Sequence, residues 1–153
     1  PVPHELRAAL GGWVFGCDVC SEVCPWGKDA PDASARFGLL PAIEEGSLSS
    51  WLGLSPEAFA ERFAGSPVQR TGRDGLARNA ALALGAMPSD AGRAALERAL
   101  QDPSPLVREA AFWGLARAHR GELGVAGALQ RALASESDIR AAAGMTRTRA
   151  EVL

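Results

Sequence analysis

Hydrophobic residues recur at helical spacing from Ser55 to the end of the chain. Ser55 and Pro56 are typical of an N-cap residue followed by a proline in the first helical turn. Phe59 and Phe63 stand four residues apart, so they share one face of this helix. A Gly-Ser-Pro sequence follows at residues 65–67. The pattern therefore predicts a helix that ends near Phe63.

The same pattern predicts three further helices. One ends before Pro88, and its apolar residues are Leu76, Ala80, Ala83 and Leu84. Another spans about residues 91–101, and the next begins at the pair Ser104-Pro105. Alanine is common in all of them, which permits close contact between helices.

Short motifs recur through these helices. Ala-Leu-x-x-Ala-Leu occupies residues 95–100 and returns at 128–133, an offset of 33 residues. Val107-Arg108-x-Ala-Ala returns as Ile139-Arg140-x-Ala-Ala, an offset of 32, and a shorter copy begins at Arg78. Two helices per repeat of this length predict a mainly α protein built as an α-solenoid. An irregular helical bundle is the alternative.

The stretch from Leu100 to Ala111 resembles HEAT-like repeats, in which an Asp and an Arg at these places link successive turns. The resemblance implies that Arg108 is structural. Trp113 lies in a repeat helix beside Phe112 and is expected in the core.

The composition of the chain changes near residue 37. Residues 1–36 hold all three Cys, four of the ten Pro and two of the four Trp, with one short helical pattern at residues 3–10. We therefore expect a partial ferredoxin-like segment at residues 1–36, connecting helices at 37–65 and a HEAT-like repeat domain at 66–153.

The three Cys form a compact motif with the spacing C-x2-C-x3-C-P, made by Cys17, Cys20 and Cys24. This is close to the ferredoxin run C-x2-C-x2-C-x3-C-P with one Cys missing. In two-cluster ferredoxins the Cys before Pro serves the other cluster. By that rule Cys17 and Cys20 ligate one 4Fe–4S cluster and Cys24 the second. Five more ligands must then come from elsewhere.

Other interpretations of the Cys motif remain open. A structural zinc site needs four ligands, and the only nearby His is His4. Buried structural Cys would make the Cys-Pro ending a coincidence. Thiol exchange through Cys17 and Cys20 lacks the preceding strand of a thioredoxin-like site.

Charge and hydropathy narrow the class of protein. The formal net charge is −2, and every basic residue but Lys28 is Arg, which neither requires nor excludes an RNA partner. No apolar stretch approaches the length of a membrane-spanning helix, and charged residues occupy the place of a signal peptide. Closely spaced free Cys indicate a reducing compartment, hence the cytoplasm. The start at Pro1 without Met suggests a piece of a longer protein.

Two signatures in order resemble the epoxyqueuosine reductase family and cover most of residues 3–118. The first is Pro3-x-Glu-Leu-Arg followed by Gly12-x-x-Phe-Gly-Cys-Asp-x-Cys-x-x-x-Cys-Pro-Trp. The second runs from Phe59 to Gly85 through Gly-Ser-Pro-x-x-Arg and Gly-Leu-x-Arg-Asn. Residues 135–153 match less well.

The resemblance implies the C-terminal part of a cytosolic enzyme that reduces epoxyqueuosine to queuosine at the wobble position of tRNA. It also implies two 4Fe–4S clusters and cobalamin, with an electron donor, and we expect a monomer. The cobalamin domain, the proton-donating acid and the first Cys run would lie before Pro1, so we expect no catalytic residue in this chain and no activity from it alone. Cys17 and Cys20 would hold the cluster nearer the cobalamin and Cys24 the outer one.

Five further residues receive roles from the resemblance. The turn formed by Cys17 and Asp18 would touch the corrin, although for Asp18 a loop residue bonded to its own backbone is the alternative. Arg70 and Arg78 would bind phosphates of the tRNA anticodon stem-loop, with Ser66 and Asn79 as hydrogen-bond donors. A solvated loop and helix start is the alternative for this basic stretch.

Two other functions stay open. One is a generic ferredoxin-like electron-transfer module fused to a HEAT-type binding scaffold with another substrate. The other is a non-catalytic HEAT-type scaffold whose Cys are vestigial.

Overall fold

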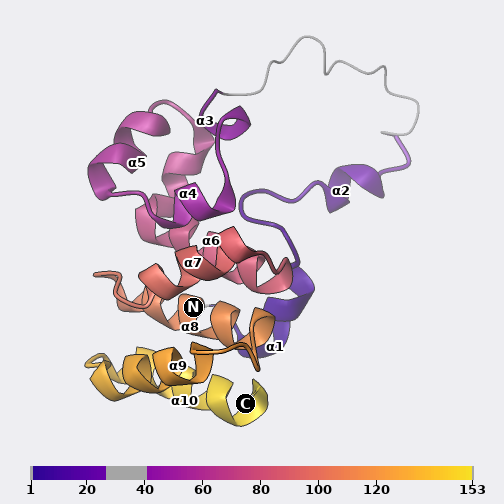
Figure 1. The fold of residues 1–153 in the computed structure, drawn as a ribbon. Coiled ribbons are helices and arrows are strands. Elements are labelled where there is room, and N and C mark those ends of the chain that lie inside the picture. Colours follow the sequence, from indigo (N-terminus) through magenta and orange to yellow (C-terminus); the bar gives the residue numbers. More distant parts are fainter. Residues whose placement is uncertain (1, 27–40, 153) are drawn as a thin grey trace.

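The computed structural model of the chain describes residues 2–26 and 41–152, and every regular element in these ranges is helical (Figure 1). The predicted boundary between residues 36 and 37 lies outside the described residues, and the three domain limits stay predictions. The elements are α1 (His4–Arg7), η1 (Ala8–Leu10), α2 (Val19–Glu22), α3 (Pro41–Glu44), α4 (Leu48–Leu52), α5 (Pro56–Arg62), η3 (Pro67–Thr71), α6 (Gly72–Ala86), α7 (Asp90–Ala99), α8 (Pro105–Ala118), α9 (Val125–Ser135) and α10 (Ile139–Val152).

The helices from α4 to α10 stack as a solenoid, which confirms the predicted fold class. Helix α8 is its centre, because it packs against α6, α7, α9 and α10. Helix α4 packs against both α6 and α7. Figure 1 shows the hairpin of α9 and α10 closing one end of the stack, with α3 and α5 at the other. Helix α1 lies at the side of the stack, near α8.

Serine caps start several of these helices where the sequence predicts them. Ser55 Oγ accepts a hydrogen bond from the Ala58 amide at 3.1 Å, at the start of α5. Ser89 Oγ does the same for α7 through the Gly92 amide. Ser104 is the N-cap residue of α8, but its side chain makes no cap bond. Its backbone amide donates instead to Asp102.

Small residues and one large aromatic side chain make the central contact of the core. Ala77, Ala80 and Ala81 on α6 and Ala110 and Ala111 on α8 are all fully buried. Because alanine side chains are small, the backbones of α6 and α8 approach each other closely.

Trp113 is in the core, as predicted, and is 4% exposed. Its ring lies between two guanidinium groups, with Arg7 at 5.9 Å and Arg117 at 5.6 Å from the ring centroid. Both contacts are cation–π interactions, which stabilise a buried indole without removing its apolar packing.

Two Arg–carboxylate pairs link successive repeats. Arg108 on α8 donates to Glu136 from Nε at 2.7 Å and Nη2 at 2.6 Å, and from Nη1 to the carbonyl of Asp102. Arg73 on α6 makes a similar two-nitrogen contact with the Asp102 carboxylate. The structural role predicted for Arg108 is therefore confirmed.

The last repeat is shifted relative to the sequence motif. Val107 is fully buried, whereas Ile139, its counterpart at an offset of 32, is 85% exposed. The linking acids Asp102 and Glu136 instead lie 34 residues apart. Val107 and Ile139 therefore do not occupy equivalent positions.

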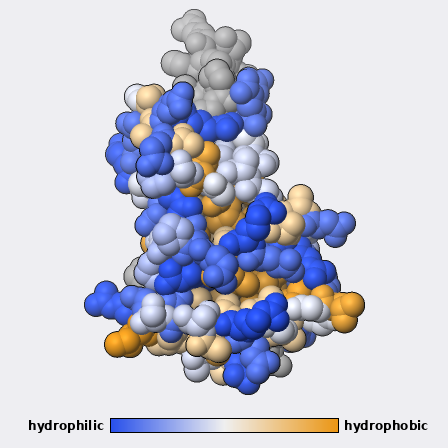
Figure 2. Space-filling view, turned by 60° about the vertical axis from the view of Figure 1, so that its left-hand side comes forward, coloured by the Kyte–Doolittle hydropathy of each residue, from blue (hydrophilic) through white to orange (hydrophobic). Residues whose placement is uncertain are grey.

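The surface of the solenoid is mainly polar. On the face drawn in Figure 2, hydrophilic side chains cover the outer parts of the helices, and hydrophobic colour shows chiefly in the seams between them. None of the helices in the described ranges has the length and apolar character needed to cross a membrane.

Candidate functional site

The Cys motif lies on a segment that projects from the solenoid. Figure 1 shows α2 set apart from the stacked helices at the end of an extended stretch. Cys17 and Cys20 are exposed, Cys24 is half-buried, and all three are free thiols. Short helix α2 places Cys20 in its first turn, and the Asp18 carbonyl accepts bonds from the amides of Ser21 and Glu22.

The thiols suit a soft metal such as the iron of an iron–sulfur cluster. Within residues 2–26 and 41–152, however, no three His, Cys, Asp or Glu side chains come together as a group that could hold a metal ion. The assignment of Cys17 and Cys20 to one cluster and of Cys24 to another stays a prediction.

Asp18 is the residue before α2. Its side chain makes no cap hydrogen bond, so the alternative of a carboxylate bonded to the start of its own helix is not seen. Its predicted contact with a corrin ring stays a prediction.

Ser66 directly precedes the short helix η3, and Arg70 lies in its last turn. Ser66 Oγ accepts a hydrogen bond from the Val68 amide at 3.2 Å, so Ser66 caps η3. Arg70 is exposed, and its guanidinium has no hydrogen-bond or ion-pair partner among the described residues. Arg70 is therefore a free cation, whereas the Ser66 hydroxyl already serves the fold.

Arg78 and Asn79 lie on α6 and interact with each other. Arg78 Nε donates to Asn79 Oδ1 at 2.9 Å, and Asn79 Nδ2 donates to the Val14 carbonyl at 2.7 Å. Burial lowers the pKa of Arg78 below its usual value, and the nearby positive charge of Arg7 lowers it further. Arg78 has no carboxylate partner in the part of the chain that the structure describes.

These contacts bring two groups of predicted residues together. Val14 stands three residues before Cys17, so the Asn79 bond places α6 next to the Cys segment. Arg73 also contributes to the basic character of residues 65–83, but its guanidinium is already bonded within the solenoid. Its Nε donates to the Leu54 carbonyl at 2.7 Å in addition to the Asp102 pair.

Sequence reasoning missed the attachment of α1 to the solenoid. Arg7 donates to the two carboxylate oxygens of Glu109 at 2.7 and 2.9 Å, and His4 Nε2 lies 3.1 Å from the same carboxylate. The side chains of Arg7 and Glu109 are 3% and 8% exposed. The available signal was a carboxylate at residue 109 directly before the apolar stretch at residues 110–116 of α8.

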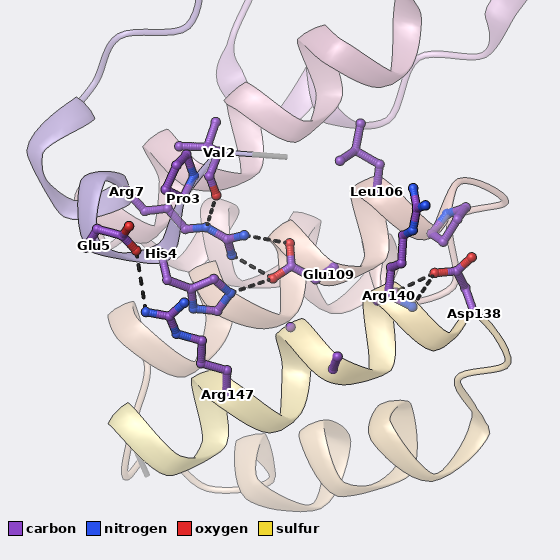
Figure 3. Close-up of a pocket in the computed structure, with 14 residues that line it drawn as sticks. Val2, Pro3, His4, Glu5, Arg7, Leu106, Glu109, Asp138, Arg140 and Arg147 are labelled. Carbon is purple, nitrogen blue, oxygen red and sulfur yellow. Dashed lines mark hydrogen bonds and ion pairs between the residues drawn. The ribbon is translucent and has the colours of Figure 1, made fainter.

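The Arg7–Glu109 pair stands beside a cavity of about 720 Å³. Figure 3 shows Arg7 and His4 pointing from α1 toward Glu109, and Arg140 and Asp138 on the other side at the start of α10. The cavity therefore lies between α1, α8 and the start of α10, while Arg147 farther along α10 reaches Glu5 of α1 at 3.4 Å.

The repeat helices match a known protein family. The sequence profile of HEAT repeats matches residues 69–146, which include α6 to α9 and part of α10. The chain belongs to the HEAT-repeat family. Its HEAT repeats are the Arg-linked hairpins described above.

Curated relatives identify what the HEAT-repeat chain is similar to. The epoxyqueuosine reductase of Xanthomonas campestris pv. campestris is 38% identical over 122 residues, covering 76% of this chain and 33% of that protein. The epoxyqueuosine reductase of Pseudomonas aeruginosa is 39% identical over 118 residues, with the same coverages. The resemblance inferred from the motifs is confirmed, and the chain spans about a third of the length of these relatives.

Solved structures of epoxyqueuosine reductases have a similar fold. A crystal structure of epoxyqueuosine reductase with an epoxyqueuosine-modified tRNA-Tyr stem loop superposes with a TM-score of 0.80 and 28% identity. It covers 96% of this chain and 39% of that one. The likeness therefore includes the Cys segment as well as the HEAT repeats.

Proposed function

We propose that this chain is the part of an epoxyqueuosine reductase that carries one Cys run and the helical repeats, and that the whole enzyme acts on tRNA. The observation that carries the proposal is the hydrogen bond between Asn79 and Val14. It places a helix with an unpaired cation next to the segment that bears the Cys motif. A redox group and an RNA-binding surface must be neighbours in an enzyme that reduces a modified base.

The Cys residues would supply thiolate ligands to two 4Fe–4S clusters. Cys17 and Cys20 would hold the cluster nearer the cobalamin, and Cys24 the outer one. When bound, these groups supply one-electron transfer, and cobalamin supplies the site of reduction. The exposed position of Cys17 and Cys20 leaves room for the remaining ligands to approach from elsewhere in the protein. Asp18, with no cap bond to hold its carboxylate, would face the corrin.

The tRNA would contact the surface formed by η3 and the start of α6. Arg70 is a free guanidinium, able to form two parallel hydrogen bonds with a phosphate. Arg78 is half-buried without a carboxylate partner, so a phosphate would offset the cost of desolvating its charge. Ser66 and Asn79 lie beside these two residues along the chain. The same surface faces solvent at Arg70, which gives an RNA loop access.

The remaining expectations follow from the reaction. The enzyme would need an electron donor, would work as a monomer and would belong to the cytoplasm, where thiols stay reduced and tRNA is available.

The proposal is tested on the anaerobically purified full-length protein. We expect turnover of epoxyqueuosine in tRNA, together with bound iron and sulfide. Cys17→Ala and Cys20→Ala should alter one set of EPR features and Cys24→Ala another. Clusters without turnover on this tRNA would support an electron-transfer module with a different substrate, and a protein without iron and sulfide would be a HEAT scaffold.

A further inference from the structure

The Cys segment is fixed to the solenoid at Val14. The Val14 side chain packs against the apolar cluster of Phe59, Phe63, Val68 and Leu76, and its carbonyl accepts the bond from Asn79. Beyond Val14, no hydrogen bond joins Phe15, Gly16 or Cys17 to another residue in the described ranges. Among the described residues, Val14 therefore accepts the last hydrogen bond from the solenoid before the first Cys.

A turn directly follows this attachment. Gly16 has a φ of 75°, a conformation that L side chains rarely adopt, so the chain changes direction one residue before Cys17. The next hydrogen bonds begin at the Asp18 carbonyl, within the first turn of α2. A shift of the Val14 carbonyl would thus be transmitted through only two residues to the Cys17 thiol.

The Asn79 amide is oriented by its neighbour. Arg78 can only donate, so the Asn79 atom that it contacts must be the carbonyl oxygen. The amide nitrogen then points at the Val14 carbonyl, which can only accept. Helix α6 itself is held by contacts with α4, α7 and α8. The bond to Val14 therefore comes from a packed helix and has a defined polarity.

We propose that Asn79 is a positioning residue for the Cys17–Cys20 turn and that Arg78 orients its amide. This inference rests on the proposed function, since it assigns these two residues to the cluster-bearing segment of the same enzyme. Asn79 acts through Val14 and does not touch the cluster. Its substitution therefore changes the environment of the Cys17 and Cys20 thiolates without removing a ligand.

The test uses two variants in the full-length protein. Asn79→Leu removes both hydrogen bonds at similar volume. Asn79→Asp keeps an acceptor for Arg78 but loses the donor to Val14. It therefore isolates the effect of the hydrogen bond between residue 79 and the Val14 carbonyl. The matched control is Ser89→Ala, which removes the cap bond of α7 far from the Cys segment along the chain. Amide hydrogen exchange, EPR spectra and cluster midpoint potentials are measured for the parent, for these three variants and for Arg78→Gln.

We expect both Asn79 variants to exchange the Trp13 amide, which lies next to Val14 and is hydrogen-bonded to the Leu10 carbonyl, at least several-fold faster than the parent. Their EPR features from the cluster held by Cys17 and Cys20 should broaden or shift, with a changed midpoint potential. Ser89→Ala should lower the melting temperature and leave these signals unchanged. Arg78→Gln should give a weaker form of the Asn79 effect.

The possible outcomes separate this inference from the function on which it rests. Unchanged exchange and EPR spectra in both Asn79 variants would overturn it, even if these variants bind tRNA more weakly, because a tRNA contact alone does not position the Cys segment. A parent protein without clusters would overturn the proposed function instead. In that case the exchange rate of the Trp13 amide still decides whether Asn79 positions the segment.

Discussion

Gly85 of α6 and Gly114 of α8 face each other where the two helices cross. A Cβ atom placed on Gly85 would lie 2.7 Å from the Gly114 Cα, and one placed on Gly114 would lie 2.6 Å from the Ala81 carbonyl oxygen. Both distances are far below van der Waals contact, and the obstructing atoms belong to the backbone. The central contact of the solenoid therefore requires glycine at both positions, because neither has space for a Cβ atom.

Gly114→Ala should destabilise the protein by about 1–3 kcal/mol, because the added methyl group forces two packed helices apart. Gly75→Ala on α6 is the control, since its Cβ would meet only Thr71 at an ordinary 3.4 Å. Replacing a helical Gly that has space should leave stability unchanged or raise it by about 1 kcal/mol. Thermal unfolding of both variants measures the difference, and equal melting temperatures would contradict this account of the crossing.

Glu136→Gln should weaken the link between the last two repeats in a pH-dependent way. The Arg108 guanidinium holds the pKa of Glu136 below its usual value, aided by the amides of Asp138 and Ser137. Folding therefore favours the carboxylate. Its contribution is complete above the pKa of the unfolded chain, about 4.3, and is lost as the pH falls through the lower pKa of the folded protein. The stability deficit of the variant should thus be largest near neutral pH.

Urea unfolding of parent and variant at neutral pH and near pH 3 measures this deficit. At neutral pH we expect about 1–3 kcal/mol, since the half-buried Arg108 guanidinium loses its charged partner and one of the two acceptor oxygens at residue 136. Glu97→Gln, which removes a partly exposed pair with Arg93, should change stability little at either pH. A deficit that stays constant with pH would indicate that the Glu136 charge is not its source.

Glu109→Gln should loosen α1 and the segment that follows it. Arg7 would keep its charge in a buried position without a carboxylate, which typically costs about 3–5 kcal/mol. The double variant Arg7→Met with Glu109→Gln removes the unpaired charge and should recover part of the loss. Thermal unfolding and hydrogen exchange of residues 4–10 check both effects. If the double variant is less stable than Glu109→Gln, the loss arises from packing and not from the charge.

Arg70→Gln should weaken tRNA binding and make it less dependent on salt. Removing one phosphate contact reduces the slope of log affinity against log salt by about 1. Arg98→Gln is the matched control, because Arg98 is also exposed and unpaired among the described residues but lies on α7. Stability should stay within about 0.5 kcal/mol in both variants. Equal losses of affinity would reduce the role of Arg70 to general charge.

Local signals were sufficient for the helices and for the family resemblance. Ser55 and Pro56 start α5 as predicted, because an N-cap acts within a single turn. The partners of charged residues could not be found in this way. Arg73 and Asp102 are 29 residues apart and Arg7 and Glu109 are 102 apart, so only the folded chain brings them together.

The register predicted for the last repeat was wrong for a related reason. In an Ala-rich helix many faces have similar hydropathy, so a shift of two residues barely changes the pattern of the sequence. Packing distinguishes them, since Met145 and Thr148 are fully buried while Ile139 is not. The positions of the linking acids, which are tertiary features, set the true offset.

The Arg7–Glu109 pair also determines when α1 can dock during synthesis of the chain. Glu109 is synthesised 102 residues after Arg7, a delay of about 5–20 seconds at the usual speed of a ribosome. From the synthesis of the Cys residues until that of Glu109, the thiols exist on a chain in which α1 still lacks its buried partner. Chaperones and any iron–sulfur delivery system thus meet the Cys motif first as part of a free nascent segment.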